Sequence, residues 1–211
     1  MLVHDMRTPM QVLLAHLELL RYDINGEAAQ DVEAAIDGAT TLSRMTTSLL
    51  DVSRLEAGRM PLQRLRTDLF VLAHSVVRSI RILQPTLDVA VEARGDSVCI
   101  CDPELTRRII ENLVSNSMKH TRTDGQVRVI ISGSPDKVQI AVHDDGPGIP
   151  RAKRSRIFDL YSADGLLSTT GSESSGIGLA FCRLAAEAQD GTIRIEGDGT
   201  DGSLFVVELP R

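Results

Sequence analysis

The chain is poor in aromatic residues, in cysteine, in positive charge and in long apolar runs. It contains no Trp, and Phe, Tyr and Trp together make 3% of its 211 residues, so its core must be aliphatic. No apolar run approaches the roughly 18 residues that a membrane helix needs, and no signal peptide is recognised at the N-terminus. The net charge of −6 argues against nucleic acid as the main partner. An apolar content of 42% predicts an ordinary globular protein.

Cysteine is scarce as well. Cys99 and Cys101 alternate with apolar residues, as in a short strand, and Cys182 stands alone. No further Cys or His lies at metal-ligand spacing from them, so we expect buried, reduced thiols rather than a metal or redox site. Reduced thiols and the missing membrane segment favour a cytoplasmic location.

The first 58 residues have the apolar spacing of helices. Apolar residues recur at threes and fours on both sides of Asn25-Gly26, a strong turn signal. Two helices with such seams rarely bury them alone, so a helical hairpin that dimerises into a four-helix bundle is expected. The seams consist of Met6, Met10, Leu13, Leu17 and Leu20, and of Val32, Ile36, Ala39, Leu42, Met45, Leu49, Val52 and Leu55.

The pattern changes to mixed α and β after a linker near Gly58 and Pro61. Residues 160–176 are rich in Ser, Thr and Gly and predict a long loop. The remaining stretches predict three helices and six strands. The helices are expected at 69–83, 103–120 and 176–189, and the strands at 87–93, 97–101, 126–132, 137–144, 192–196 and 203–209.

The first chemical motif is His4-Asp5 with Pro9 shortly after it. A neutral imidazole can act as a nucleophile when a neighbouring carboxylate orients or accepts its other proton. Pro9 should bend the helix just past the histidine. On its own, the motif is better explained by an exposed surface histidine before a proline kink.

The second motif is a helix that carries Asn112, Asn116 and Lys119 on one face. Amide oxygens are ligands suited to Mg²⁺, and a lysine can reach a phosphate. The opposite face, with Ile110, Leu113, Val114 and Ser117, is expected to pack. Taken alone, the polar face could equally be a solvated surface.

Two glycine-rich segments follow. Asp144 ends a predicted strand before a glycine turn, where a carboxylate can accept a hydrogen bond from a purine amine. The segment 171–178 opens the last helix, where backbone amides and the helix dipole favour a phosphate. It is neither a P-loop nor a dinucleotide-binding fingerprint. An acidic turn and an ordinary glycine loop are the simpler alternatives.

The order and spacing of these motifs resemble the bacterial sensor histidine kinase family over nearly the whole chain. His4–Pro9 is similar to its H box, although the family usually has Glu and Leu at Asp5 and Met6. The N box matches 111–121, the two glycine boxes match 144–148 and 175–179, and the F box matches 157–161. Residues 53–58 resemble the end of the dimerisation hairpin, and residues 202–205 resemble the turn into the final strand.

The resemblance implies a fold of the α+β class with two domains. Residues 1–60 would form the dimerisation and histidine phospho-acceptor hairpin, a dimeric four-helix bundle. Residues 61–211 would form an α/β sandwich ATP-binding domain of the histidine kinase, gyrase and chaperone type. Only three residues precede His4, so the sequence leaves open whether the chain is a fragment of a longer protein and whether such a parent is membrane-anchored.

The resemblance also implies roles for single residues. His4 would take the γ-phosphoryl group of ATP, with Asp5 as general base, and the phosphoryl group would pass to a response-regulator receiver domain. Asp5 and Thr8 would also serve dephosphorylation of that regulator. Asn112 would coordinate Mg²⁺ and Asp144 would bind the adenine amino group. The other nucleotide-site residues implied are Asn116, Lys119, His120, Gly146, Gly148, Gly176 and Gly178.

One departure from the family bears on activity. The family often has a basic residue in the loop after the F box, yet no Lys or Arg occurs between Asp159 and Cys182. The basic cluster 151–156 could substitute, or it could be a solvated helix face. The leading hypothesis is therefore a dimeric, ATP-dependent protein-histidine kinase. The alternatives are a degenerate phosphotransfer or docking module that uses ATP poorly, and an ATPase of the gyrase or chaperone type.

Overall fold

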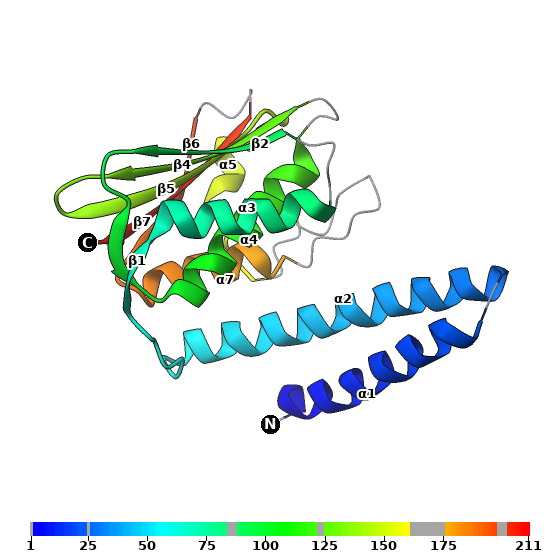
Figure 1. Ribbon diagram of the computed structural model, residues 1–211. Coiled ribbons are helices and arrows are strands. Elements are labelled where there is room, and N and C mark those ends of the chain that lie inside the picture. The colour runs from blue at the N-terminus through cyan, green and yellow to red at the C-terminus, as the bar shows by residue number, and fades with distance from the viewer. Residues whose placement is uncertain (1, 25, 84–87, 122–124, 161–175, 198–201) are drawn as a thin grey trace. The chain divides into compact units, whose positions relative to one another are not determined.

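A computed structural model of the chain describes residues 2–24, 26–83, 88–121, 125–160, 176–197 and 202–211. The chain divides into two compact units, Met1–Ala57 and Gly58–Arg211, each with its own set of internal contacts (Figure 1). None of the described helices combines the length and the apolar character that crossing a membrane would take. The predicted loop at 160–176 lies almost entirely outside the described residues.

The first unit is the predicted helical hairpin. Helix α1 (Leu2–Asp23) continues through Pro9 and packs beside helix α2 (Glu27–Glu56). Gly26 takes a φ of 75° at the turn, a left-handed conformation that favours glycine. Ile36, Ala39, Val52 and Leu55 are buried on α2, yet several apolar side chains of the two helices remain exposed. These exposed side chains are Val12, Leu13, Leu19, Leu20 and Leu42.

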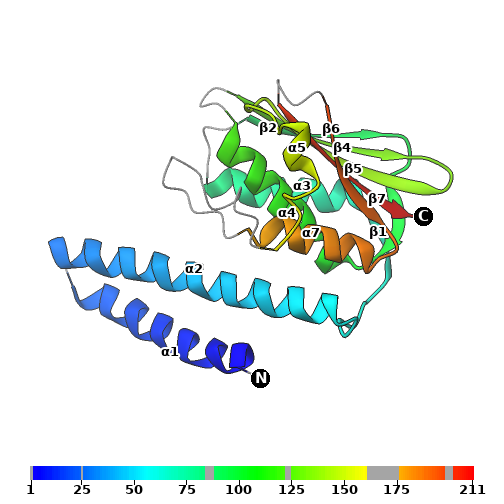
Figure 2. The same ribbon diagram turned by 180° about the vertical axis from the view of Figure 1, so that it is seen from behind.

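The second unit contains a five-stranded mixed sheet in the order β2-β4-β5-β7-β6 (Figure 2). Strands β2 and β4 run parallel, whereas the other neighbouring pairs are antiparallel. Both predicted hairpin pairs, β4 with β5 and β6 with β7, are confirmed. The strands are β2 (Asp88–Arg94), β4 (Gln126–Gly133), β5 (Lys137–Asp144), β6 (Thr192–Glu196) and β7 (Ser203–Pro210).

Three helices lie against one face of this sheet (Figures 1 and 2). They are α3 (Leu69–Leu83), α4 (Pro103–His120) and α7 (Gly178–Glu187), and a short helix, α5 (Arg151–Arg154), follows β5. The bounds predicted for α3 and α4 are confirmed, whereas α7 begins two residues later and ends two residues earlier than expected. The core between helices and sheet is mainly aliphatic, as the composition requires. Its largest fully buried side chains include Phe181, Phe205, Leu69, Ile109, Ile110, Leu113, Ile131 and Ile140.

A separate two-stranded sheet joins β1 (Leu65–Asp68) and β3 (Val98–Cys101) in antiparallel register. The sequence did not predict β1, because its four residues alternate too briefly to be recognised. Cys99 and Cys101 are buried on β3, and Cys182 is buried on α7; all three are free thiols.

Asp102 connects the start of α4 to distant parts of the second unit. Its carboxylate accepts hydrogen bonds from the amides of Glu104 and Leu105, both at 3.0 Å, and so caps the helix. The other carboxylate oxygen accepts from the Gln63 amide at 2.8 Å. The Asp102 amide itself donates to Gln189 Oε1 at 2.7 Å. Asp102 is only 6% exposed, so these contacts replace its water shell.

We predict that Asp102→Ala lowers the free energy of unfolding by about 1–3 kcal/mol, because the helix loses its cap and buried amides lose their acceptor. Urea unfolding followed by circular dichroism measures the change. Asp136→Ala is the matched control, since Asp136 is exposed in the β4–β5 turn and accepts a bond there through its backbone carbonyl. Equal stability of the two variants would contradict this account of Asp102.

Candidate functional site

Asp144 is the buried centre of the candidate site. It is the last residue of β5 and is 1% exposed. One carboxylate oxygen accepts from the amides of Gly146 at 3.1 Å and Ser203 at 3.2 Å. The other accepts from the Ser117 hydroxyl at 2.9 Å. These donors come from the glycine turn, from β7 and from α4, so the carboxylate holds three segments together. An ionised carboxylate offers about four acceptor positions, which leaves capacity for a ligand donor.

Helix α4 has the two faces that the sequence predicts. Ile110, Leu113, Val114 and Ser117 are buried on the packing side. On the polar side Asn112 and Asn116 are half-buried, and Lys119 and His120 are exposed. The Asn112 amide group donates to the Arg108 carbonyl oxygen at 2.8 Å, one turn earlier in the helix. That bond fixes the orientation of the Asn112 side chain.

Glycines of both predicted glycine boxes approach α4 closely. A Cβ on Gly178 would lie 2.8 Å from Asn112 Oδ1, so the start of α7 touches the asparagine face. A Cβ on Gly146 would lie 2.7 Å from the His120 carbonyl oxygen. Gly148 and Gly176 have positive φ values of 75° and 62°. The glycines therefore bring two backbone segments against the helix that carries the predicted ligand residues.

The first turn of α7 offers a place for an anion. The helix begins at Gly178 after Ile177, and the side chain at that cap makes no hydrogen bond to the helix amides. Free amides and the positive end of the helix dipole favour a phosphate. Because Gly178 lies against Asn112, an anion there would be close to an amide oxygen suited to Mg²⁺.

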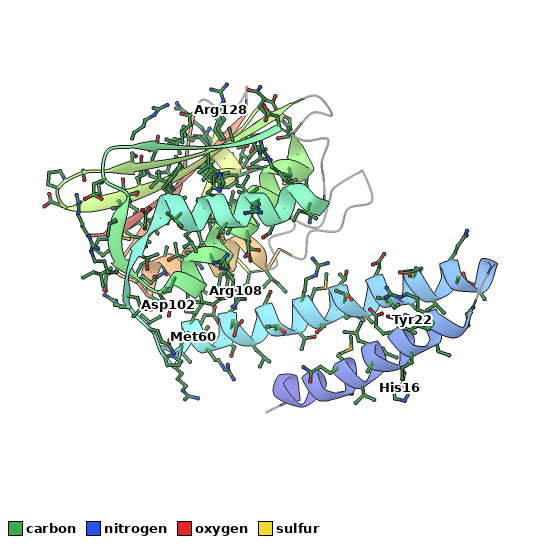
Figure 3. All side chains as sticks on the ribbon, viewed as in Figure 1. His16, Tyr22, Met60, Asp102, Arg108 and Arg128 are labelled. Carbon is green, nitrogen blue, oxygen red and sulfur yellow. The ribbon has the colours of Figure 1, made fainter. Side chains whose placement is uncertain are left out.

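Two charged side chains of α4, Glu111 and Arg108, are half-buried. Burial raises the pKa of Glu111, the neighbour of Asn112, and the positive charges of Arg107 and Arg108 oppose that rise. The guanidinium of Arg108, which is labelled in Figure 3, lies 4.1 Å from the centre of the Phe181 ring on α7, a cation–π contact.

The basic cluster before the F box is only partly a solvated face. Arg154 donates from Nε to the Ile149 carbonyl at 2.9 Å and from Nη1 to the Gly197 carbonyl at 3.0 Å. The Arg154 guanidinium is thus bonded to backbone carbonyl oxygens, whereas the Arg151 and Arg156 side chains are exposed. Ile157 and Phe158 of the F box are buried, which anchors the segment that enters the undescribed residues 161–175.

The predicted phospho-acceptor motif belongs to the other unit. His4, Asp5 and Thr8 lie within α1, and their side chains fall outside the described residues. The described part of the chain therefore brings Gly178 against Asn112, and Gly146 against His120 and Asp144, but it does not relate these residues to His4.

Sequence reasoning missed two donors to Asp144. Ser117 was assigned to packing and Ser203 to a turn, yet both bond the buried carboxylate. A signal for Ser117 existed, because a serine interrupts an otherwise apolar stripe of α4. Ser203 has no comparable local signal, since only the pairing of β5 with β7 brings it next to Asp144.

We predict that Gly178→Ala weakens binding of magnesium-nucleotide by about tenfold or more, because the new methyl group collides with Asn112 Oδ1. Isothermal titration with a non-hydrolysable ATP analogue measures the effect. Gly38→Ala serves as control, because a Cβ there meets nothing within 4 Å. Unchanged affinity of the Gly178 variant would show that the contact with Asn112 is unimportant for the ligand.

Two protein families match the chain. Residues 1–58 match the His Kinase A (phospho-acceptor) domain. Residues 101–211 match the histidine kinase-, DNA gyrase B-, and HSP90-like ATPase.

Similar proteins agree with these matches. Adaptive-response sensory kinase SasA of Synechococcus sp. (strain JA-3-3Ab) is 31% identical over 222 residues, covering 100% of this chain and 58% of that protein. Hybrid signal transduction histidine kinase D of Dictyostelium discoideum is 31% identical over 217 residues, covering 98% of this chain and 14% of that protein. The chain thus spans less than two thirds of these relatives. The crystal structure of full-length ShkA in complex with AMPPNP superposes with a TM-score of 0.84 at 25% identity, covering 99% of this chain and 44% of that one.

Proposed function

Because the chain belongs to the sensor histidine kinase family, we propose that it transfers the γ-phosphoryl group of ATP to His4 and then to an aspartate of a response-regulator receiver domain. Residues 1–60 would act as the dimerisation and phospho-acceptor domain, and residues 61–211 as the catalytic ATP-binding domain. The observation that carries this proposal is the constellation of Asp144, the asparagine face of α4 and the glycines that touch it.

The second unit contains the family's ATP-binding domain, and its geometry suggests how adenine is read. Asp144 would accept a hydrogen bond from the adenine amino group through its remaining acceptor capacity. Its bonds to Ser117, Gly146 and Ser203 would hold the carboxylate ready before ATP arrives. Asn116, Lys119, His120, Gly148 and Gly176 would complete the nucleotide site.

Mg²⁺ fits the donors that surround this site. It commonly binds through one or two protein oxygens together with substrate phosphates and waters. The Asn112 amide oxygen is such a donor, and it lies against the first residue of α7, where phosphates are favoured. Within the described residues no group of three His, Cys, Asp or Glu side chains is placed to hold a metal. Nucleotide phosphates and waters would complete the Mg²⁺ coordination. When bound, Mg²⁺ neutralises phosphate charge during transfer.

At the acceptor, a ring nitrogen of His4 would attack the γ-phosphorus while the bond to ADP breaks. Asp5 would take or orient the proton on the other ring nitrogen. In dephosphorylation of the response regulator, Asp5 and Thr8 would position the water that removes phosphate from the receiver domain. The cytoplasmic location inferred from the sequence stays a prediction.

A second copy of the chain is the proposed partner of the first unit. Leu13, Leu20 and Leu42 are each about half exposed, and Leu19 is 66% exposed. An apolar surface of this kind on two long helices is typical of a helix bundle completed by another hairpin. The family of the first unit supports a dimer. The degenerate-module alternative has less support, because the family matches include the ATPase domain and the glycines of both boxes lie against α4.

The proposal predicts acid-labile, alkali-stable radiolabel when the chain is incubated with γ-labelled Mg-ATP, and no label on His4→Ala. His16→Ala is the matched control on the same helix. His16 is exposed, and its ring bonds the Val12 carbonyl oxygen. We expect this control to label like the wild type.

Label that persists on His4→Ala would contradict the assignment of the acceptor. Absence of label from a wild-type chain that binds Mg-ATP would contradict kinase activity. A chain that binds no Mg-ATP at all would favour the docking-module alternative.

A further inference from the structure

The linker between the two units ends at a polar contact on the second unit. The Arg64 guanidinium pairs with the Asp190 carboxylate at 2.5 Å and donates to the Ala188 carbonyl oxygen at 3.4 Å. Directly before it, the Gln63 amide donates to Asp102 at 2.8 Å. We define these contacts of Gln63 and Arg64 as the linker latch.

The linker latch contacts one end of each of two helices. Asp102 is the cap at the N-terminus of α4, and Ala188 is the cap at the C-terminus of α7. The carbonyls at a helix C-terminus carry partial negative charge and favour a cation such as Arg64. Gln189 joins both sides, because its Oε1 accepts from the Asp102 amide at 2.7 Å and its Nε2 donates to Ala185.

The backbone at Asp190 is a second observation that points to this contact. Asp190 has a φ of 60°, and it is the one non-glycine residue with positive φ in the described part of the chain. Glycine would adopt this conformation more easily, and a strained residue is retained when its side chain has a use. At this position Asp190 supplies the carboxylate that binds Arg64.

Beyond the latch the linker is much less restrained. Among the described residues, no hydrogen bond or ion pair joins residues 58–62 to another part of the chain, and Gly58 has a φ of 61°. Helix α2 ends at Glu56. The segment free to pivot is therefore limited to the few residues between Glu56 and Gln63.

We propose that Arg64 and Asp190 are positioning residues for phosphoryl transfer, because the latch fixes the linker to the second unit and confines interdomain movement to residues 58–62. This inference rests on the proposed function, since transfer requires the acceptor helix to meet the nucleotide. Helix α7 carries Gly178 of the nucleotide site at one end and holds Arg64 at the other, so one rigid element joins the two.

Both partners are substantially exposed, at 40% for Arg64 and 69% for Asp190. An exposed ion pair contributes little to stability, so its reversal leaves the fold intact. The test uses the full-length chain in four forms: wild type, Arg64→Asp, Asp190→Arg and the double charge swap. Arg94→Asp is the matched control, because Arg94 pairs with Glu92 on β2 and has no contact with the linker.

Two measurements are made on each form. Hydrogen exchange with mass spectrometry follows the amides of residues 63–66, which include the bonded Gln63 amide. γ-Labelled Mg-ATP at saturation gives the rate of autophosphorylation. Each single reversal should speed exchange about tenfold and slow labelling about fivefold or more, because positioning is lost. The affinity for Mg-ATP should stay within about twofold. The double swap should restore both readouts in part, because it re-forms the ion pair but leaves the Ala188 carbonyl oxygen without its donor.

Exchange at wild-type rates in the single variants, or a double swap no better than either single change, would overturn the latch. A wild type that gives no label, while Arg64→Asp still accelerates exchange, would overturn the proposed kinase function and the role in transfer, yet retain the latch as a structural contact. Wild-type labelling in both single variants would overturn the positioning role alone.

Discussion

The hydrogen bonds around the Asp144 carboxylate are the interaction on which the rest of the site depends. A buried carboxylate is costly unless its oxygens are bonded, and here α4, the glycine turn and β7 supply the donors. The same bonds fix the distance between the end of β5 and the asparagine face of α4. In the proposed nucleotide site, the bonds that join the sheet to α4 would therefore also prepare the Asp144 carboxylate for ATP.

Helix α7 extends this constraint across the second unit. Gly178 at its start touches Asn112, and Ala188 at its end accepts from Arg64. At about 1.5 Å per residue, its ten residues span roughly 15 Å. Under the proposed linker latch, a ligand at the start of α7 would contact the same helix that holds the linker. Two sites on one rigid element give a physical basis for coupling, provided that the element has two positions.

The sequence predicts local structure well here and long-range contacts poorly. The helical spacing predicts α3 and α4 with the right bounds, and alternation predicts both hairpin pairs, because these signals are periodic. The parallel pairing of β2 with β4, the strand β1 and the Ser203 bond to Asp144 depend on residues far apart in sequence. The latch is invisible for the same reason, since Arg64 and Asp190 are separated by 126 positions. The sequence predicts Asn112, Asp144 and Gly178 as site residues because each lies in a short motif whose members are close together in sequence.

The central claim, that the Asp144 carboxylate reads the adenine amino group, is tested most directly by comparing ATP with inosine triphosphate, which has a carbonyl oxygen in place of that amino group. Isothermal titration gives the affinities of wild type, Asp144→Asn and the control Asp136→Asn, which changes an exposed carboxylate in the β4–β5 turn. The account predicts that wild type and control prefer ATP by about tenfold or more, since a hydrogen bond to a charged group contributes about 1.5–3 kcal/mol. Asp144→Asn should lose most of that preference. Equal binding of both nucleotides to the wild type would contradict the account.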